Sequence, residues 1–107
     1  MQINRVIIEG NLSKDASLEQ TPSGKVVANF TVCNNRYFKK KEAEDFSKVV
    51  SFVDCEAWEA LAMASADHLK KGAAVRVEGR LTQNKWVDQD GIMRSRLKIT
   101  AGSIQPV

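Results

Sequence analysis

The sequence predicts an all-β domain, a small five-stranded barrel with one helix between its third and fourth strands. Several stretches alternate apolar and polar side chains with the period of two that is typical of half-buried strands, and turn-forming residues separate them. One Ala- and Leu-rich stretch in the middle of the chain has instead the spacing of an amphipathic helix. The length suits a single domain over residues 1–107.

The first half of the chain contains three predicted strands, joined by a turn and a longer loop. The segment Thr21-Pro22-Ser23-Gly24 is typical of a tight turn, because proline presets one backbone angle and glycine accepts a left-handed one. Residues 37–47 are strongly charged and longer than a hairpin needs, so they are interpreted as a loop. The predicted strands are residues 2–12, with a continuation over 18–21, residues 25–35 and residues 48–57.

The second half begins with the helix and ends with a hairpin. Its composition favours a helix over residues 58–71, with Gly72 as a left-handed stop. Residues 73–86 then alternate as a fourth strand, and residues 93–101 form a fifth after the turn Asp88-Gln89-Asp90-Gly91. Five strands with a helix after the third is the order of the OB-fold, although this pattern alone leaves other small barrels open.

The charge of the chain is modest overall and unevenly distributed. The net charge is +3, with basic residues in excess over 1–41 and 75–107 and acidic residues in excess over 42–74. A basic surface suits a polyanionic partner, and a solvated mixed surface explains the same pattern equally well. No apolar run approaches the ~20 residues of a membrane helix, and the N-terminus lacks the pattern of a signal peptide. The cytoplasm is therefore the expected location.

Few residues of the sequence are candidates for catalytic groups or metal ligands. Cys33 and Cys55 are far apart and His68 is the only histidine, so neither a zinc site, which needs about four ligands, nor another cofactor is expected. Asp88 and Asp90 flank a turn glycine, which accounts for both. The sequence has no glycine-rich phosphate loop and no recognisable pairing of a nucleophile with a base. It therefore predicts a binding protein and not an enzyme.

Aromatic residues fall on the polar side of two predicted strands. Side chains alternate along a strand, so residues of equal parity share a face. In the third strand, Phe52 and, at its end, Trp58 share the parity of two carboxylates. In the fourth, Trp86 shares the parity of Arg76 and Arg80. The apolar sets expected to face the core are Val49, Val53, Cys55 and Ala57 in the third strand and Val75, Val77, Gly79 and Leu81 in the fourth.

Flat rings beside cations on an open sheet suit single-stranded nucleic acid, because bases stack on the rings while the cations contact phosphates. We favour this role for Trp86, whereas packing at the helix start explains Trp58 nearly as well. Tyr37 and Phe38 precede a run of three lysines, where a solvated charged loop is an equally good interpretation. For Phe52, Trp58 and Trp86, the alternative is that the rings cap the barrel or fill a subunit interface.

Four segments resemble the bacterial single-stranded-DNA-binding protein (SSB) family. Residues 4–12 are similar to its opening strand and residues 21–30 to its next turn and strand. Residues 75–81 and 85–91 are similar to its fourth strand and the following loop. The resemblance covers nearly the whole chain in order. It implies an OB-fold homotetramer that wraps single-stranded DNA in replication, recombination and repair, in the cytoplasm and associated with the nucleoid.

The resemblance also implies which residues bind the strand. The stacking positions of the family fall on Phe38, Phe52, Trp58 and Trp86. Together with parity and charge, it predicts binding without sequence preference to single-stranded DNA, with RNA as an alternative strand. The predicted interface comprises the aromatic residues Tyr37, Phe38, Phe52, Trp58 and Trp86 and the basic residues Arg36, Lys39, Lys40, Lys41, Arg76, Arg80, Lys85, Arg94, Arg96 and Lys98.

The chain departs from the family pattern in several respects. Asp54 stands where a basic residue is common, and the identities of three stacking aromatics differ from the best-known pattern. Family members usually continue into a flexible tail with an acidic tip that recruits replication proteins, whereas this chain ends at Val107. Tail-mediated partners are therefore not expected. Two alternatives remain open: a tail-less relative such as primosomal replication protein N, and an OB-fold module that binds other proteins.

Overall fold

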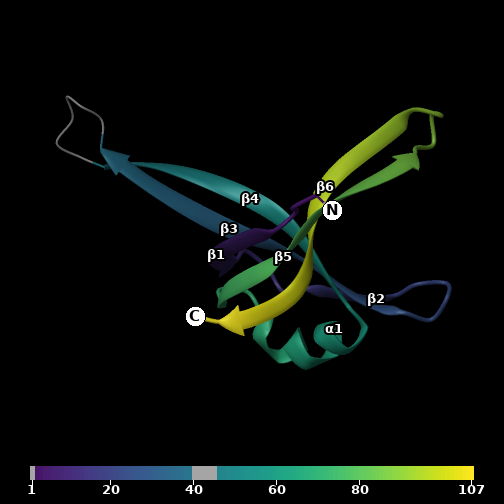
Figure 1. The fold of residues 1–107 in the computed structure, drawn as a ribbon, viewed down its shortest axis with the longest axis horizontal. Coiled ribbons are helices and arrows are strands. Elements are labelled where there is room, and N and C mark those ends of the chain that lie inside the picture. Colours follow the sequence, from purple (N-terminus) through teal and green to yellow (C-terminus); the bar gives the residue numbers. More distant parts are fainter. Residues whose placement is uncertain (1, 40–45) are drawn as a thin grey trace.

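The protein is all-β in the computed structural model, which describes residues 2–39 and 46–107 (Figure 1). Five strands form a closed barrel, a short sixth strand lies at its edge, and one short α-helix packs against it. The elements are β1 (Val6–Leu12), β2 (Ser17–Gln20), β3 (Val26–Lys39), β4 (Phe46–Trp58), the helix α1 (Glu59–Ser65), the 3-10 turn η1 (Ala66–His68), β5 (Ala74–Val87) and β6 (Met93–Pro106).

Pairing between neighbouring strands closes the barrel. The strand order is β1-β5-β6-β4-β3, and the last two residues of β1 pair with β3 to complete the ring. The pairings are antiparallel except for β4–β6, a short parallel contact that links Cys55 to Ile99 and Glu56 to Thr100. β2 adds an edge strand to the beginning of β3. The arrangement is consistent with an OB fold.

The core lies inside the barrel and beneath α1, which packs against β3, β4 and β6. Val75 and Val77 of β5 are buried, which confirms the predicted inward parity for this part of the strand. Gly10 and Gly79 lie where strands approach so closely that any side chain would collide with the backbone of a neighbouring strand. The buried core cluster consists of Leu12, Ala28, Phe30, Val32, Cys55, Ala57, Ala62, Leu69, Val75, Val77 and Ile99.

Two hairpins continue beyond the barrel as arms that leave it in different directions (Figure 1). The β3–β4 arm comprises residues 34–39 and 46–52, and the β5–β6 arm comprises residues 81–87 and 93–97. In the arms, side chains of inward parity no longer meet a core. Ile99 is 2% exposed, whereas Leu97, two residues earlier on the same face of β6, is 61% exposed. The prediction that Val49 and Leu81 face the core is wrong for the same reason, since both are exposed.

The helix is shorter than predicted and follows the fourth strand, not the third. The strand count changes because residues 17–20 form a strand of their own instead of continuing the first. The helix ends at Ser65 because the chain then turns Leu69 into the core. The backbone N–H of Lys71 donates to the Asp15 carboxylate at 2.7 Å, so contacts with the β1–β2 connection replace further helical bonds. Within the described part of the chain, no helix is long and apolar enough to cross a membrane.

The predicted loop over residues 37–47 is wrong at both ends. Residues 37–39 pair with residues 46–48, so the hairpin extends much further than its charged sequence indicates. The middle of this segment lies outside the described residues.

The ends of two other strands also differ from the prediction. β1 begins at Val6 and not near Gln2. Before Val6, the side chain of Asn4, and not the backbone, forms the hydrogen bonds to β5. Its amide donates to the Leu81 carbonyl and accepts from the Leu81 N–H, both at 2.8 Å. β6 continues to Pro106, because the pairing with β5 skips one residue near Gly79 and then resumes.

Candidate nucleic-acid interface

The β5–β6 arm carries a tryptophan and a row of cations on one side. Trp86 lies directly opposite Arg94, and Arg96 and Lys98 follow on β6 with the same parity. Directly opposed residues of an antiparallel pair share a face. This face points away from the core, because Ile99, of opposite parity, is buried. We call Arg94, Arg96 and Lys98 the β6 cation row; neighbouring members are two residues, or about 7 Å, apart along the strand.

Each member of the β6 cation row is held by an acceptor. Two acceptors are carboxylates and the third is a side-chain amide. The three cations keep part of their surface exposed, and contacts of this kind position a side chain without withdrawing it from a ligand. The contacts are Arg94 Nε to Asp88 Oδ2 at 2.8 Å, Arg96 Nη1 to Asp54 Oδ2 at 3.5 Å and Lys98 Nζ to Asn29 Oδ1 at 3.2 Å.

Asp88 is fixed by the turn that it begins. Its carboxylate accepts hydrogen bonds from the backbone N–H groups of Ile92 and Asp90, both at 2.9 Å, and from Arg94. The bond from Ile92 and the charged bond from Arg94 lower the pKa of Asp88 below its usual value. Gly91 has a positive φ of 76° in the same turn. The sequence-based interpretation of Asp88 as a turn residue is confirmed.

The β3–β4 arm carries exposed rings on the corresponding side. Phe52 of β4 is 68% exposed and lies opposite Cys33 of β3. Tyr37 has the same parity as Cys33 and is also exposed. Lys39 lies opposite Phe46, whose ring adds a third exposed aromatic to this side of the arm. Rings and two lysines, Lys39 and Lys48, therefore share one surface here.

A hydrogen-bonded junction joins the two surfaces into what we call the outer face, the side of β3, β4, β6 and β5 turned away from the core. The hydroxyls of Thr82 and Thr100 are 2.8 Å apart, and Thr100 donates to the buried carboxylate of Glu56 at 3.0 Å. Thr31 donates to Asp54 at 3.1 Å. These bonds satisfy polar groups at the middle of the face and link β3, β4, β5 and β6 there.

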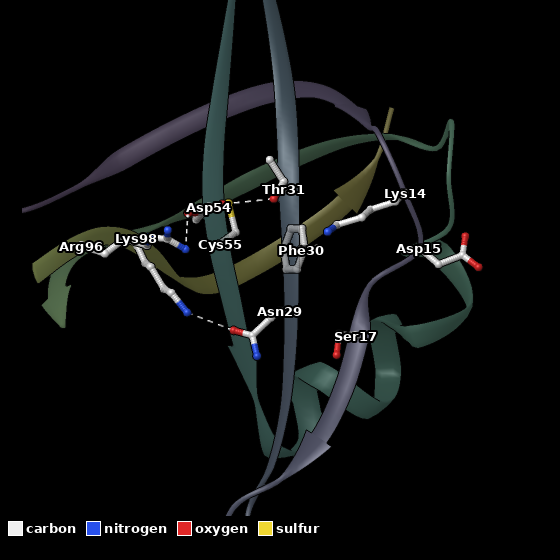
Figure 2. Close-up of a pocket in the computed structure, with 10 residues that line it drawn as sticks. All are labelled: Lys14, Asp15, Ser17, Asn29, Phe30, Thr31, Asp54, Cys55, Arg96 and Lys98. Atoms are coloured by element: carbon white, nitrogen blue, oxygen red, sulfur yellow. Dashed lines mark hydrogen bonds and ion pairs between the residues drawn. The ribbon is translucent and has the colours of Figure 1, made fainter. Parts of the chain in front are cut away.

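An open pocket of about 160 Å³ lies at this junction, beside the connection between β1 and β2. Figure 2 shows Lys14, from that connection, extending toward the ring of Phe30 at one side of the pocket. Arg96 and Lys98 border the opposite side (Figure 2). Cations on two sides of a pocket suit an anionic group such as a phosphate.

Several predicted interface residues lie away from the outer face. Arg76 shares the parity of the arm's tryptophan but precedes it by ten residues, about 33 Å of strand, and forms an ion pair with Glu9 at 3.1 Å. Lys85 has the opposite parity and lies on the other side of the β5–β6 arm. Lys40 and Lys41 lie outside the described residues.

The other predicted residues are divided between the two sides of the sheet. Arg36 and Phe38 lie together on the inner side of the β3–β4 arm, with the guanidinium carbon 6.0 Å from the ring centroid, as in a cation–π pair. Arg80 lies opposite Thr100 and belongs to the outer face. Trp58 ends β4 directly before α1 and is partly exposed.

Four residues of the outer face were not predicted to belong to the interface: Phe46, Lys48, Lys14 and Asn29. Phe46 lies inside the charged stretch that was interpreted as a loop, and parity would have grouped it with Phe52 had the strand been extended. Lys14 and Asn29 reach the face only through the way that β1, β2 and β3 meet. Nothing in their local sequence indicates this role.

The cysteines offer little chemistry. Cys55 is buried in the core, and burial, followed by the nearby charge of Asp54, raises the pKa of its thiol to about 12, so it stays protonated. Cys33 is partly exposed on the outer face. Among the described residues, no group of three or more His, Cys, Asp or Glu side chains is placed to hold a metal ion.

Comparison with known families identifies the domain that carries this face. The sequence profile of the Single-strand binding protein family matches residues 3–107. The chain belongs to this family. The match includes all six strands, and with them both arms and the junction between them.

Curated relatives from several bacteria support this membership. The single-stranded DNA-binding protein of Wolinella succinogenes is 39% identical over 102 residues, which cover 95% of this chain and 62% of the relative. That of Helicobacter hepaticus is 40% identical over 102 residues, covering 95% of this chain and 59% of the relative. Single-stranded DNA-binding protein 2 of Chlorobaculum tepidum is 41% identical over 105 residues, covering 97% and 70%. The chain thus spans about three fifths of the length of the first two relatives.

Proposed function

We propose that the chain binds single-stranded DNA without sequence preference, along the outer face. The observation that carries this proposal is the continuous surface on which exposed rings and the β6 cation row lie together. The bases would stack on Phe52, Tyr37 and Trp86, and the phosphates would contact the cations beside them. Family membership and the names of the relatives support the same function.

This mode of binding explains a preference for single strands over duplex. Stacking on a protein ring needs a base whose face is free, and the bases of a duplex already stack on each other. The rings accept any base because every base presents a π-face, so little sequence preference is expected. Single-stranded RNA satisfies the same requirement and is a second candidate ligand.

The chemistry on this face supports a binder and not an enzyme. Stacking and ion pairing require no reaction at a bound strand, and the buried carboxylate of Glu56 is held by Thr100 as part of the junction. The roles that fit such a protein are protection of exposed strands in replication, recombination and repair, in the cytoplasm beside the nucleoid. Recruitment of replication proteins through a C-terminal tail is not part of this proposal.

We also propose that the protein is a homo-oligomer, most simply a tetramer. Ile7 of β1 is 56% exposed and lies on the outside of the barrel, flanked by the ion pairs Arg5–Glu78 and Arg76–Glu9. An apolar centre with a charged rim is the composition of a subunit interface. Light scattering at micromolar concentration is expected to give a multiple of the 11.9 kDa chain mass. Ile7→Glu should lower that mass while Leu18→Glu, on the edge strand, should not; a monomeric wild type would contradict the proposal.

One titration series separates the proposed function from its two alternatives. Tryptophan fluorescence is recorded during addition of oligo(dT), oligo(U) and a duplex of equal length. Strong quenching by oligo(dT) and weak quenching by the duplex is the expected result. A protein-interaction module predicts no quenching by any of them. A dimeric mass together with strand binding would favour a relative of primosomal replication protein N.

A further inference from the structure

Besides the buried Glu56, a partly exposed carboxylate stands in the middle of the outer face, where the cations nearby suit a polyanion. Asp54 lies on β4 between the exposed ring of Phe52 and the β6 cation row, and it lines the pocket in Figure 2. Its side chain is 36% exposed, so a strand bound to this face would meet its negative charge. A negative group at this place opposes phosphate binding, and its retention there calls for a physical explanation.

The contacts of Asp54 assign its two oxygens to different neighbours. Oδ1 accepts a hydrogen bond from Thr31, which lies directly opposite on β3, at 3.1 Å. Oδ2 is 3.5 Å from Nη1 of Arg96, the middle member of the β6 cation row. Figure 2 shows the carboxylate between these two side chains, and Thr31 therefore holds it in position to face the guanidinium.

Arg96 can easily exchange Asp54 for another anionic partner. Arg96 is 61% exposed, and an ion pair as open as this one contributes little free energy in water. A guanidinium has five N–H donors in a planar fork that matches a phosphate as well as a carboxylate. Asp88 differs, because two backbone N–H groups also fix it as part of the turn. Asp54 is thus the carboxylate of the row whose contact with a cation a phosphate can replace.

We propose that Asp54 is an internal competitor of the DNA phosphates: it occupies Arg96 in the free protein, and a strand must displace it. This inference rests on the proposed function of the outer face. Asp54 thereby sets the affinity below the value that the cations alone would give and makes binding less sensitive to salt. Asp54 also makes the strand dissociate faster, because its carboxylate pairs with Arg96 again as a phosphate leaves.

The experiment compares two variants with the same net charge. Asp54→Asn keeps an oxygen that can accept the bond from Thr31, and Asp67→Asn removes an equally negative but exposed group on η1, away from the outer face. Binding of fluorescein-labelled oligo(dT) is measured by anisotropy over a range of salt concentrations. Because the strand no longer has to displace a carboxylate, Asp54→Asn should bind about fivefold more tightly at about 0.1 M salt, and its log–log salt slope should be steeper by less than the value of about 0.7 for a whole phosphate contact. Asp67→Asn should match the wild type within about twofold.

A second pair of variants tests whether the effect acts through Arg96. In an Arg96→Gln background, Asp54→Asn should change the affinity by less than about twofold, because the cation that it would release is gone. An equal gain in both backgrounds would show direct repulsion of the strand and overturn the inference. So would weaker binding by Asp54→Asn, or equal gains from Asp54→Asn and Asp67→Asn. Absence of binding by the wild type would instead refute the proposed function, and the inference with it.

Discussion

The barrel and its arms are made from the same strands, yet the same alternation has opposite consequences in the two regions. Within the barrel, side chains of inward parity on β5 and β6 are buried or partly buried, as Val77, Ile99 and Ala101 show. In the β5–β6 arm, both sides of the hairpin are open to solvent, and Leu97 and Val87 are exposed although they have the inward parity. The barrel therefore carries the stability of the domain, and the arms are free to carry side chains chosen for a ligand.

The two arms also differ from each other. On the β5–β6 arm and its base, each member of the β6 cation row already contacts an acceptor within the chain. On the β3–β4 arm the outer side carries three exposed rings, Tyr37, Phe46 and Phe52, beside two exposed lysines. We infer a division of labour in which the first arm orders cations for phosphates and the second offers surfaces on which bases stack.

The largest expected effect is a difference in stability between two substitutions on β6, one in the barrel and one in the arm. Ile99→Ala should lower the free energy of unfolding by about 2–5 kcal/mol, because it removes buried methyl groups and leaves a cavity. Leu97→Ala, two residues away on the same face, should change it by less than about 0.5 kcal/mol, because its side chain is already exposed. Urea unfolding of both variants is the measurement, and equal losses would break the distinction between barrel and arm.

The second prediction concerns the two sides of the β5–β6 arm. Trp86→Ala should cost about 1–3 kcal/mol of oligo(dT) binding with little loss of stability, because the ring is exposed and is proposed to stack on a base. Val87→Ala alters the neighbouring residue, which has the opposite parity, and should bind as the wild type does. Anisotropy titration together with thermal melting distinguishes the roles. A folded Trp86→Ala variant with unchanged affinity would rule out stacking at this ring.

A third, smaller effect should appear in the salt dependence. Lys98 is held by the neutral amide of Asn29, so its full charge is available to a phosphate. Lys98→Gln should make the log–log salt slope shallower by about 0.7, the contribution of one phosphate contact to a single strand. Lys85→Gln removes the same charge from the other side of the arm and should leave the slope unchanged. Equal slopes for both variants would mean that the strand does not follow the β6 cation row.

The smallest expected effect is a pH dependence at the tip of the β5–β6 arm. Hydrogen bonds from Ile92 and Arg94 lower the pKa of Asp88 in the folded state. Because the pKa of Asp88 is lower in the folded state, its ionised carboxylate stabilises the fold at pH values above its unfolded pKa, near 3.8. This contribution disappears as the pH falls through the pKa of the folded state. Asp88→Asn should therefore melt slightly below the wild type at pH 7, and the two should converge in strong acid. A difference that persists in strong acid would assign the effect to the shape of the turn instead of its charge.

The strands of the barrel could be predicted from the sequence, because burial of one face imposes an alternation of apolar and polar residues. This alternation is visible without knowledge of the tertiary structure. The inward positions Val75 and Val77, the helix after the strand that contains Cys55, and the turn at Asp88 all follow from local patterns. The length of the arms was underestimated because neither of their sides is buried. Residues 37–39 and 46–47 therefore have no apolar period that would indicate a strand.

The candidate site could be predicted only in part, for a related reason. Parity grouped Trp86 with Arg80 correctly on one face, but it also included Arg76, because parity says nothing of distance along the strand or of the partner Glu9. The contact between Asp54 and Arg96 joins strands that are far apart in the sequence. No local pattern indicates such a contact, which depends on how the barrel closes.

Ultraviolet crosslinking of oligo(dT) to the native protein, followed by mass spectrometry of the crosslinked peptides, tests most directly whether the outer face binds the strand. Crosslinks are expected at rings of that face, foremost Trp86 and Phe52, and their yield should decrease as salt is raised. Phe38, on the inner side of the β3–β4 arm, should crosslink weakly. Crosslinks concentrated on the inner sides of the arms, with Trp86 and Phe52 unmodified, would contradict binding of the strand along the outer face.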